Sequence, residues 1–162
     1  MPAKRFSVFI FCACFVLMTA CEHKAFDFSS YAAARARWLS YNYTTYQIEQ
    51  ERICFFCQSP QGLVQLFIVD NKVTSGVSAV ESRALTSSEL ESFRTVDQTF
   101  DWIEQTRKTK PDHFEIDYDP QYGYPARIEY KQSENALDGG ITNHMRNLQV
   151  AVFLKSSQER LK

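Results

Sequence analysis

The sequence predicts an α+β domain: an antiparallel sheet of about six strands with two helices packed on it, in the order helix, three strands, helix, three strands. Three observations predict this class. Apolar residues recur at helical spacing in two segments. In the remaining segments they alternate with polar residues, as in half-buried strands. Turn-forming residues separate the alternating segments, so antiparallel hairpins are expected.

The first half is expected to form one helix and three strands. Asp27 can cap a helix that runs to Leu39, with Tyr31 and then Trp38 or Leu39 on its apolar face. The next segment is rich in tyrosine, threonine and isoleucine, which favour strands. A tight turn is expected at Asp70-Asn71. The strands are predicted within residues 41–53, 63–69 and 73–77.

The second half repeats this order after a polar loop, residues 81–94, with room for a helical turn. Thr95 and Gln98 form a capping box, and the helix behind it places Phe100 and Ile103 on one face. Pro111 lies just past the end of this helix. Two strands should follow at residues 114–118 and 126–130. After a polar loop at 132–140, a last strand is expected to place Leu148, Val150, Val152 and Leu154 on one face.

The first twenty residues resemble a secretory signal peptide. Lys4 and Arg5 precede an apolar run of 13 residues from Phe6 to Met18, interrupted only by Ser7. Such a run fits the apolar region of a signal peptide and is shorter than the ~20 residues of a membrane span. The expected organisation is a signal peptide (1–20), a lipidated tether (21–26), a single domain (27–155) and a polar tail (156–162).

Leu17-Met18-Thr19-Ala20-Cys21 resembles the bacterial lipobox, in which the cysteine is acylated, for example with palmitate, and the chain is cut before it. The alternative is an ordinary signal peptide with an incidental cysteine. Several acyl chains hold a protein stably on a membrane. An aspartate directly after the lipidated cysteine would resemble an inner-membrane retention signal. The residue there is Glu22, so we expect the protein in the outer membrane, with its domain facing the periplasm.

Charge and composition exclude some functions. Without residues 1–20, 16 basic side chains face 19 acidic ones, a net charge of −3. A slightly acidic domain without a basic stripe is not expected to bind nucleic acid. The abundant aromatic residues predict a packed core.

Removing the leader also reduces the cysteines to one pair. Cys12 and Cys14 leave with it and Cys21 carries lipid, so Cys54 and Cys57 remain. In an oxidising compartment this pair is a disulfide candidate. Free thiols, a redox-active pair and half of a zinc site are the alternatives.

Several motifs resemble an uncharacterised family of bacterial lipoproteins whose domain has no assigned function. They include Trp38 with Tyr41-Asn42-Tyr43, the cysteine pair, and Thr95-Val96 with Phe100. The most specific is the Tyr-Gly-Tyr-Pro core of residues 118–128, followed by Asp138. The resemblance extends from Arg37 to Val152 and implies location and fold, but no reaction.

Acidic residues near this motif raise the question of a cation site. A calcium loop would carry closely spaced acidic or amide ligands ending in a glutamate, and that register is absent. A turn in which Asp117 and Asp119 accept backbone N–H groups is the preferred interpretation. We therefore predict no metal and no cofactor, and solvent-facing positions for the histidines. The residues concerned are Glu115, Asp117, Asp119, Glu129, Asp138, His23, His113 and His144.

No catalytic constellation is recognisable in the sequence. We expect a non-enzymatic, membrane-anchored envelope lipoprotein that binds membrane lipid through Cys21 and another envelope protein or ligand through its sheet or aromatic turn. The alternative is a thiol–disulfide redox module that uses Cys54 and Cys57. The partner-binding patch would consist of Tyr118, Tyr122, Tyr124 and Pro125.

Overall fold

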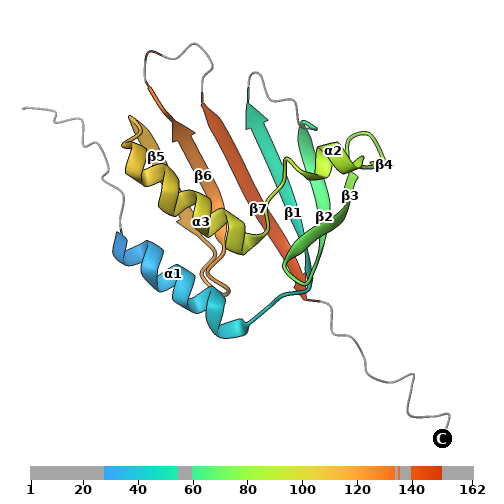
Figure 1. Cartoon of the computed structure of the whole chain (residues 1–162), viewed down its shortest axis with the longest axis horizontal. Coiled ribbons are helices and arrows are strands. Elements are labelled where there is room, and N and C mark those ends of the chain that lie inside the picture. Colours follow the sequence, from blue (N-terminus) through green and yellow to red (C-terminus); the bar gives the residue numbers. More distant parts are fainter. Residues whose placement is uncertain (1–27, 55–59, 134, 136–139, 151–162) are drawn as a thin grey trace, which may run out of the picture.

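The computed structural model describes residues 28–54, 60–133, 135 and 140–150, and it confirms a mixed fold of the α+β kind (Figure 1). The described strands form one seven-stranded antiparallel sheet in the order β4-β3-β2-β1-β7-β6-β5. They are β1 (Tyr46–Cys54), β2 (Gly62–Val69), β3 (Lys72–Ser78), β4 (Arg83–Ala84), β5 (His113–Tyr118), β6 (Pro125–Lys131) and β7 (Ile141–Val150). The helices are α1 (Phe28–Tyr41), α2 (Ser87–Leu90), α3 (Val96–Thr106) and the 3-10 turn η1 (Arg107–Thr109).

The longer elements follow the predicted order, and the short ones were not predicted as separate elements. The two residues of β4 make a seventh strand, and α2 supplies the helical turn expected within residues 81–94. The sheet consists of two meanders, β1-β2-β3-β4 and β5-β6-β7, joined where β1 pairs with β7. Among the described residues, no helix is long and apolar enough to cross a membrane.

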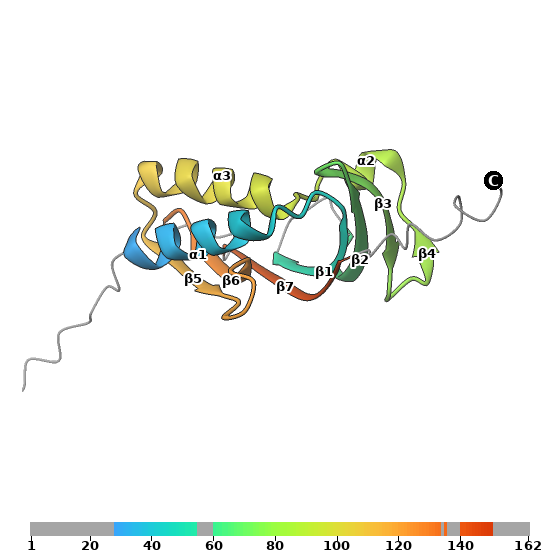
Figure 2. The ribbon, with the colours of Figure 1, turned by 90° about the horizontal axis from the view of Figure 1, so that it is seen from below.

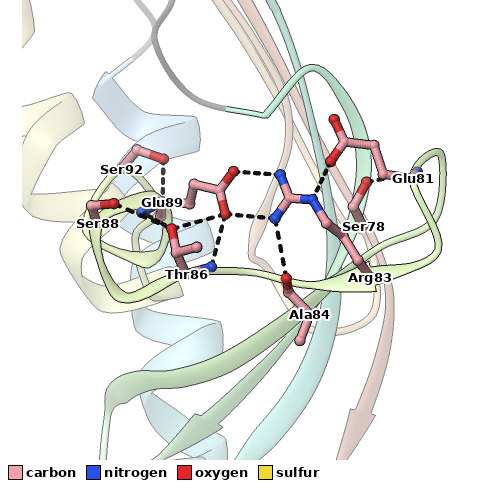
Figure 3. Close-up of polar contacts among 8 residues, drawn as sticks. All are labelled: Ser78, Glu81, Arg83, Ala84, Thr86, Ser88, Glu89 and Ser92. Atoms are coloured by element: carbon pink, nitrogen blue, oxygen red, sulfur yellow. Dashed lines mark hydrogen bonds and ion pairs between the residues drawn. The ribbon is translucent and has the colours of Figure 1, made fainter.

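A polar network around Arg83 explains why this short extra segment is ordered (Figure 3). The Arg83 guanidinium donates to both carboxylate oxygens of Glu89, at 2.6 and 2.9 Å, and pairs with Glu81. Glu89 in turn accepts from the backbone N–H of Thr86, which caps α2. These contacts lower the pKa of the Glu89 carboxyl to about 2.

Both long helices cover the same face of the sheet (Figures 1 and 2). Helix α1 buries Tyr31, Ala34 and Trp38, which lie three and four residues apart and therefore share one side of the helix. Of the two residues expected on the apolar face, Trp38 is the buried one, whereas Leu39 is 56% exposed. Helix α3 opens with the predicted Thr95–Gln98 capping box.

The core lies between these helices and the alternate residues of the central strands. A buried hydrogen bond joins α3 to the sheet, since the Val96 N–H donates to the Tyr46 hydroxyl at 2.9 Å. A part-buried one joins the two helices, since the Trp38 indole donates to Asp97 at 3.1 Å. Burial raises the pKa of Tyr46. Among the buried residues of the sheet are Tyr46, Ile48, Val64, Leu66, Ile68, Phe114, Ile128 and Met145.

The last strand begins earlier than the Leu148 pattern suggested. Strand β7 starts at Ile141 and buries Met145 against the helices. Asn147 has a φ of 55°, and the pairing with β1 shifts register there. This bulge changes which residues face the core, so simple alternation does not extend through the strand. The expected positions of Val152 and Leu154 lie outside the described residues.

Candidate functional site

The aromatic motif forms the turn between β5 and β6. The Asp119 carboxylate accepts from the backbone N–H groups of Gln121 (3.0 Å) and Tyr122 (2.7 Å), which confirms its predicted role in the turn. Asp117 does not share that role, because its carboxylate pairs with Arg127 at 3.1 Å. Gly123 has a φ of 84° and donates its N–H to the Asp119 carbonyl.

Two of the four residues of the expected partner-binding patch, Tyr124 and Pro125, lie inside the domain. Tyr124 is 5% exposed and Pro125 is fully buried. The Tyr118 ring stacks on Phe100, with the two ring centroids 6.2 Å apart. Burial and the nearby Asp119 raise the pKa of Tyr124 to about 12. Tyr118 and Tyr122 are half-buried, and Tyr122 packs against tyrosines of another segment.

Tyr122 instead joins two tyrosines from the end of α1 and the connection to β1. The rings of Tyr41 and Tyr43 stack at a centroid distance of 5.1 Å, and Tyr122 lies 5.4 Å from the first and 6.3 Å from the second. We call Tyr41, Tyr43 and Tyr122 the tyrosine cluster. Asn42, between the first two, has a φ of 52°, a backbone conformation that asparagine tolerates better than most residues.

The cluster is attached at several points and still reaches solvent. The Tyr41 hydroxyl donates to the Gln121 carbonyl at 3.1 Å, and Arg37 donates to the Pro120 carbonyl at 3.0 Å. Tyr41 is 39% exposed and the neighbouring Leu39 is 56% exposed. Desolvation and the two neighbouring tyrosines raise the pKa of Tyr43. The result is an ordered aromatic surface built from two distant parts of the chain.

Sequence reasoning placed these tyrosines in two separate motifs. Tyr41 and Tyr122 are about 80 positions apart, and only the packing of α1 against the β5–β6 turn joins them. The sequence signal that connected them was that both segments belong to the motifs of the family resemblance.

Cys54 is the last residue of β1 and is disulfide-bonded. The Gln61 side-chain amide donates to its carbonyl at 3.2 Å. Cys57, the expected partner, lies outside the described residues, so the pairing stays a prediction. Cys54 ends a strand, whereas redox-active cysteines gain reactivity at the start of a helix.

The face of the sheet opposite the helices, which we call the uncovered face, carries the predicted carboxylates in a different grouping. Three potential ligand atoms lie within 4.8 Å of one another, one each from His113, Glu115 and Glu129. His113 and Glu129 are 3.3 Å apart, and Arg127 bridges Glu129 and Asp117. These pairings raise the pKa of Arg127. The three side chains could hold a divalent cation, but the ion pairs already neutralise Glu129 and account for the arrangement.

The remaining candidates lie apart from these groups. His144 is half-buried on β7, in register with Glu51 of β1. Cys21, His23 and Asp138 lie outside the described residues.

One comparison with known proteins identifies a related group. A family model described as "Family of unknown function (DUF6174)" matches residues 30–150. This range agrees with the expected resemblance from Arg37 to Val152. No curated protein and no solved structure matches the chain.

Proposed function

The chain belongs to the DUF6174 family, whose function is unknown, and we propose that it is a lipid-anchored, non-enzymatic binding module of the bacterial envelope. Its tyrosine cluster contacts a protein associated with the same membrane. The proposal combines the processing signal in residues 1–21 with a surface that the fold assembles.

The anchor limits how far the domain can lie from the lipid. Helix α1 begins at Phe28, so residues 22–27 separate it from Cys21. At roughly 3.5 Å per extended residue, they span at most about 20 Å. The tyrosine cluster sits at the other end of α1, near enough to the membrane for a partner that is anchored or embedded there.

The tyrosine cluster, in which Tyr41 is exposed and the other two rings are half-buried, is the observation that carries the proposal. Tyrosine supplies a large contact area, loses little conformational entropy, and keeps a polar hydroxyl, which is why it is enriched at protein interfaces. Here three such rings are already held against each other, with Leu39 56% exposed beside them. Rings that are already packed against each other suit a protein partner, because preorganisation lowers the entropic cost of binding.

Site-specific photocrosslinking in intact cells tests the proposal. A crosslinking residue at Leu39 or Tyr122 should give a discrete protein adduct. The same residue at Val80, which is 70% exposed and lies between β3 and β4, is the control and should give none. Cys21→Ser, which removes the lipid acceptor, should abolish the adduct and leave an unlipidated chain by mass spectrometry. Equal adducts at all three positions, or none at Leu39 and Tyr122, would refute the proposed surface.

A further inference from the structure

Helices α1 and α3 run antiparallel, so the end of α3 lies at the same end of the domain as the start of α1 (Figures 1 and 2). The contacts fix this order: Trp38 donates to Asp97 at the start of α3, and Arg35, nearer the start of α1, pairs with Asp101 at 2.7 Å. A helix rises roughly 1.5 Å per residue, so Phe28 lies about 10 Å beyond Arg35 and η1 begins about 9 Å beyond Asp101, in the same direction.

The turn η1 and the residue after it carry three basic side chains, Arg107, Lys108 and Lys110, which we call the basic end. Lys108 and Lys110 are exposed. Glu104 pairs with Arg107 at 2.5 Å and lies 3.6 Å from Lys108. Asp112 is the other acidic residue in this stretch of the chain, so three basic groups face two acidic ones and the stretch is positive.

The helix dipole explains only part of this charge. Basic residues are favourable in the last turn of a helix, which accounts for Arg107 and Lys108. Lys110 has a φ of 52° and lies beyond the helical residues. Among the residues that the structure describes, no acidic side chain pairs with the Lys110 ammonium.

The tether brings the basic end close to lipid. Residues 22–27 span at most about 20 Å between Cys21 and the first residue of α1. Each lysine or arginine near an anionic membrane surface strengthens attraction to it by roughly fivefold. Because the anchor already holds the domain there, these charges need only select one orientation of it.

We propose that the basic end lies against an anionic lipid surface, with Lys108 and Lys110 at the headgroup phosphates. The inference rests on the lipid anchor of the proposed function and adds the orientation of the domain. Helix α1 has 14 residues and is therefore about 21 Å long. The tyrosine cluster at its far end then points away from the membrane, and its partner must reach a similar height above the lipid.

Amine labelling on vesicles tests this orientation. The mature lipidated chain is added to vesicles of phosphatidylcholine, alone or mixed with phosphatidylglycerol, and flotation shows whether it is anchored. A membrane-impermeant amine reagent then labels the exposed lysines, and mass spectrometry gives the rate at each. Lys72 is the internal control, because it is exposed and follows Asn71, whose N–H donates to the Thr44 carbonyl near the tyrosine cluster.

We expect labelling of Lys108 and Lys110 to fall by about fivefold on the anionic vesicles, with no change at Lys72. High salt should remove this protection, because it screens the attraction. Equal rates on both kinds of vesicle, for a chain that floats with both, would overturn the orientation and leave the anchor intact. A chain that floats with neither would overturn the anchor and the orientation together.

Substitutions separate charge from local structure. Lys108→Gln should reduce the protection of Lys110, and Lys110→Gln that of Lys108, by about fivefold, since each removes one charge from the contact. Lys108→Arg keeps the charge and should retain the protection of Lys110. The matched control is Lys72→Gln, which should change neither. Full protection in both glutamine variants, or the same loss in the control, would refute the role of the basic end.

Discussion

Gly123 provides the sharpest test of how the domain is held together, because its replacement by alanine should be far more damaging than the same change at Gly62. Both glycines have a positive φ, 84° and 85°. A methyl group at Gly123 would lie 2.4 Å from the backbone carbonyl oxygen of Ala34 in α1. At Gly62 it would lie 2.8 Å from the end of the Val80 side chain, which is 70% exposed and can rotate away.

The two substitutions therefore share one cost and differ in another. Placing a non-glycine residue at positive φ costs about 1 kcal/mol at either position. At Gly123 the α1 backbone or the turn must also move, and forcing a methyl group into a packed contact costs about 2 kcal/mol more. We expect Gly62→Ala to lower the free energy of unfolding by about 1 kcal/mol and Gly123→Ala by about 3 kcal/mol.

Urea denaturation monitored by tryptophan fluorescence measures both values in one series. At roughly 4 °C per kcal/mol for a domain of this size, the melting temperatures of the two variants should also differ by about 8 °C. Equal destabilisation of the two variants would mean that the positive φ alone accounts for the cost of replacing Gly123, and that the close approach to α1 contributes nothing.

Three further predictions concern single side chains. Trp38→Phe should lower the free energy of unfolding by about 2 kcal/mol in urea denaturation, because it removes the part-buried hydrogen bond to Asp97 and leaves a cavity at a buried side chain. The Glu89 carboxyl has a pKa lowered to about 2 by Arg83, so its stabilising effect is present above the ordinary value of 4.5 and is lost as pH falls toward 2. The difference in melting temperature between wild type and Glu89→Gln should therefore close over that range, and a constant difference would contradict it. The pKa of Tyr124 is raised to about 12, so its contribution is present below pH 10 and is lost as pH rises toward 12. Tyr124→Phe should accordingly lose less stability than wild type in alkaline unfolding, and parallel curves would count against this assignment.

The sequence predicted features that depend on local spacing. The Thr95 capping box and the turn at Asp119 are examples, since each is complete within four residues and its hydrogen bonds follow from the residue types. Thr86 and Glu89 form the same capping box. The helix behind them is only four residues long and shows no apolar repeat that could mark it as helical.

Features that depend on packing between distant segments were not predictable in the same way. The bulge at Asn147 is set by the pairing of β7 with β1, so strand alternation gives no sign of it. The contact between Tyr41 and Tyr122 is a second example, because it depends on the packing of α1 against the β5–β6 turn.

The Tyr-Gly-Tyr-Pro motif links helix α1 to the proposed binding surface. Gly123 lets the β5–β6 turn approach the α1 backbone, and that approach brings Tyr122 against Tyr41. The buried Tyr124 fixes the turn in the core. The motif thus acts through α1: if Gly123→Ala displaces the turn, the tyrosine cluster should come apart even where the domain remains folded. Crosslinking from Leu39 should then fall in this variant while Gly62→Ala, tested at a temperature where both variants are folded, retains it. Retention in both variants would show that partner binding does not need the assembled cluster.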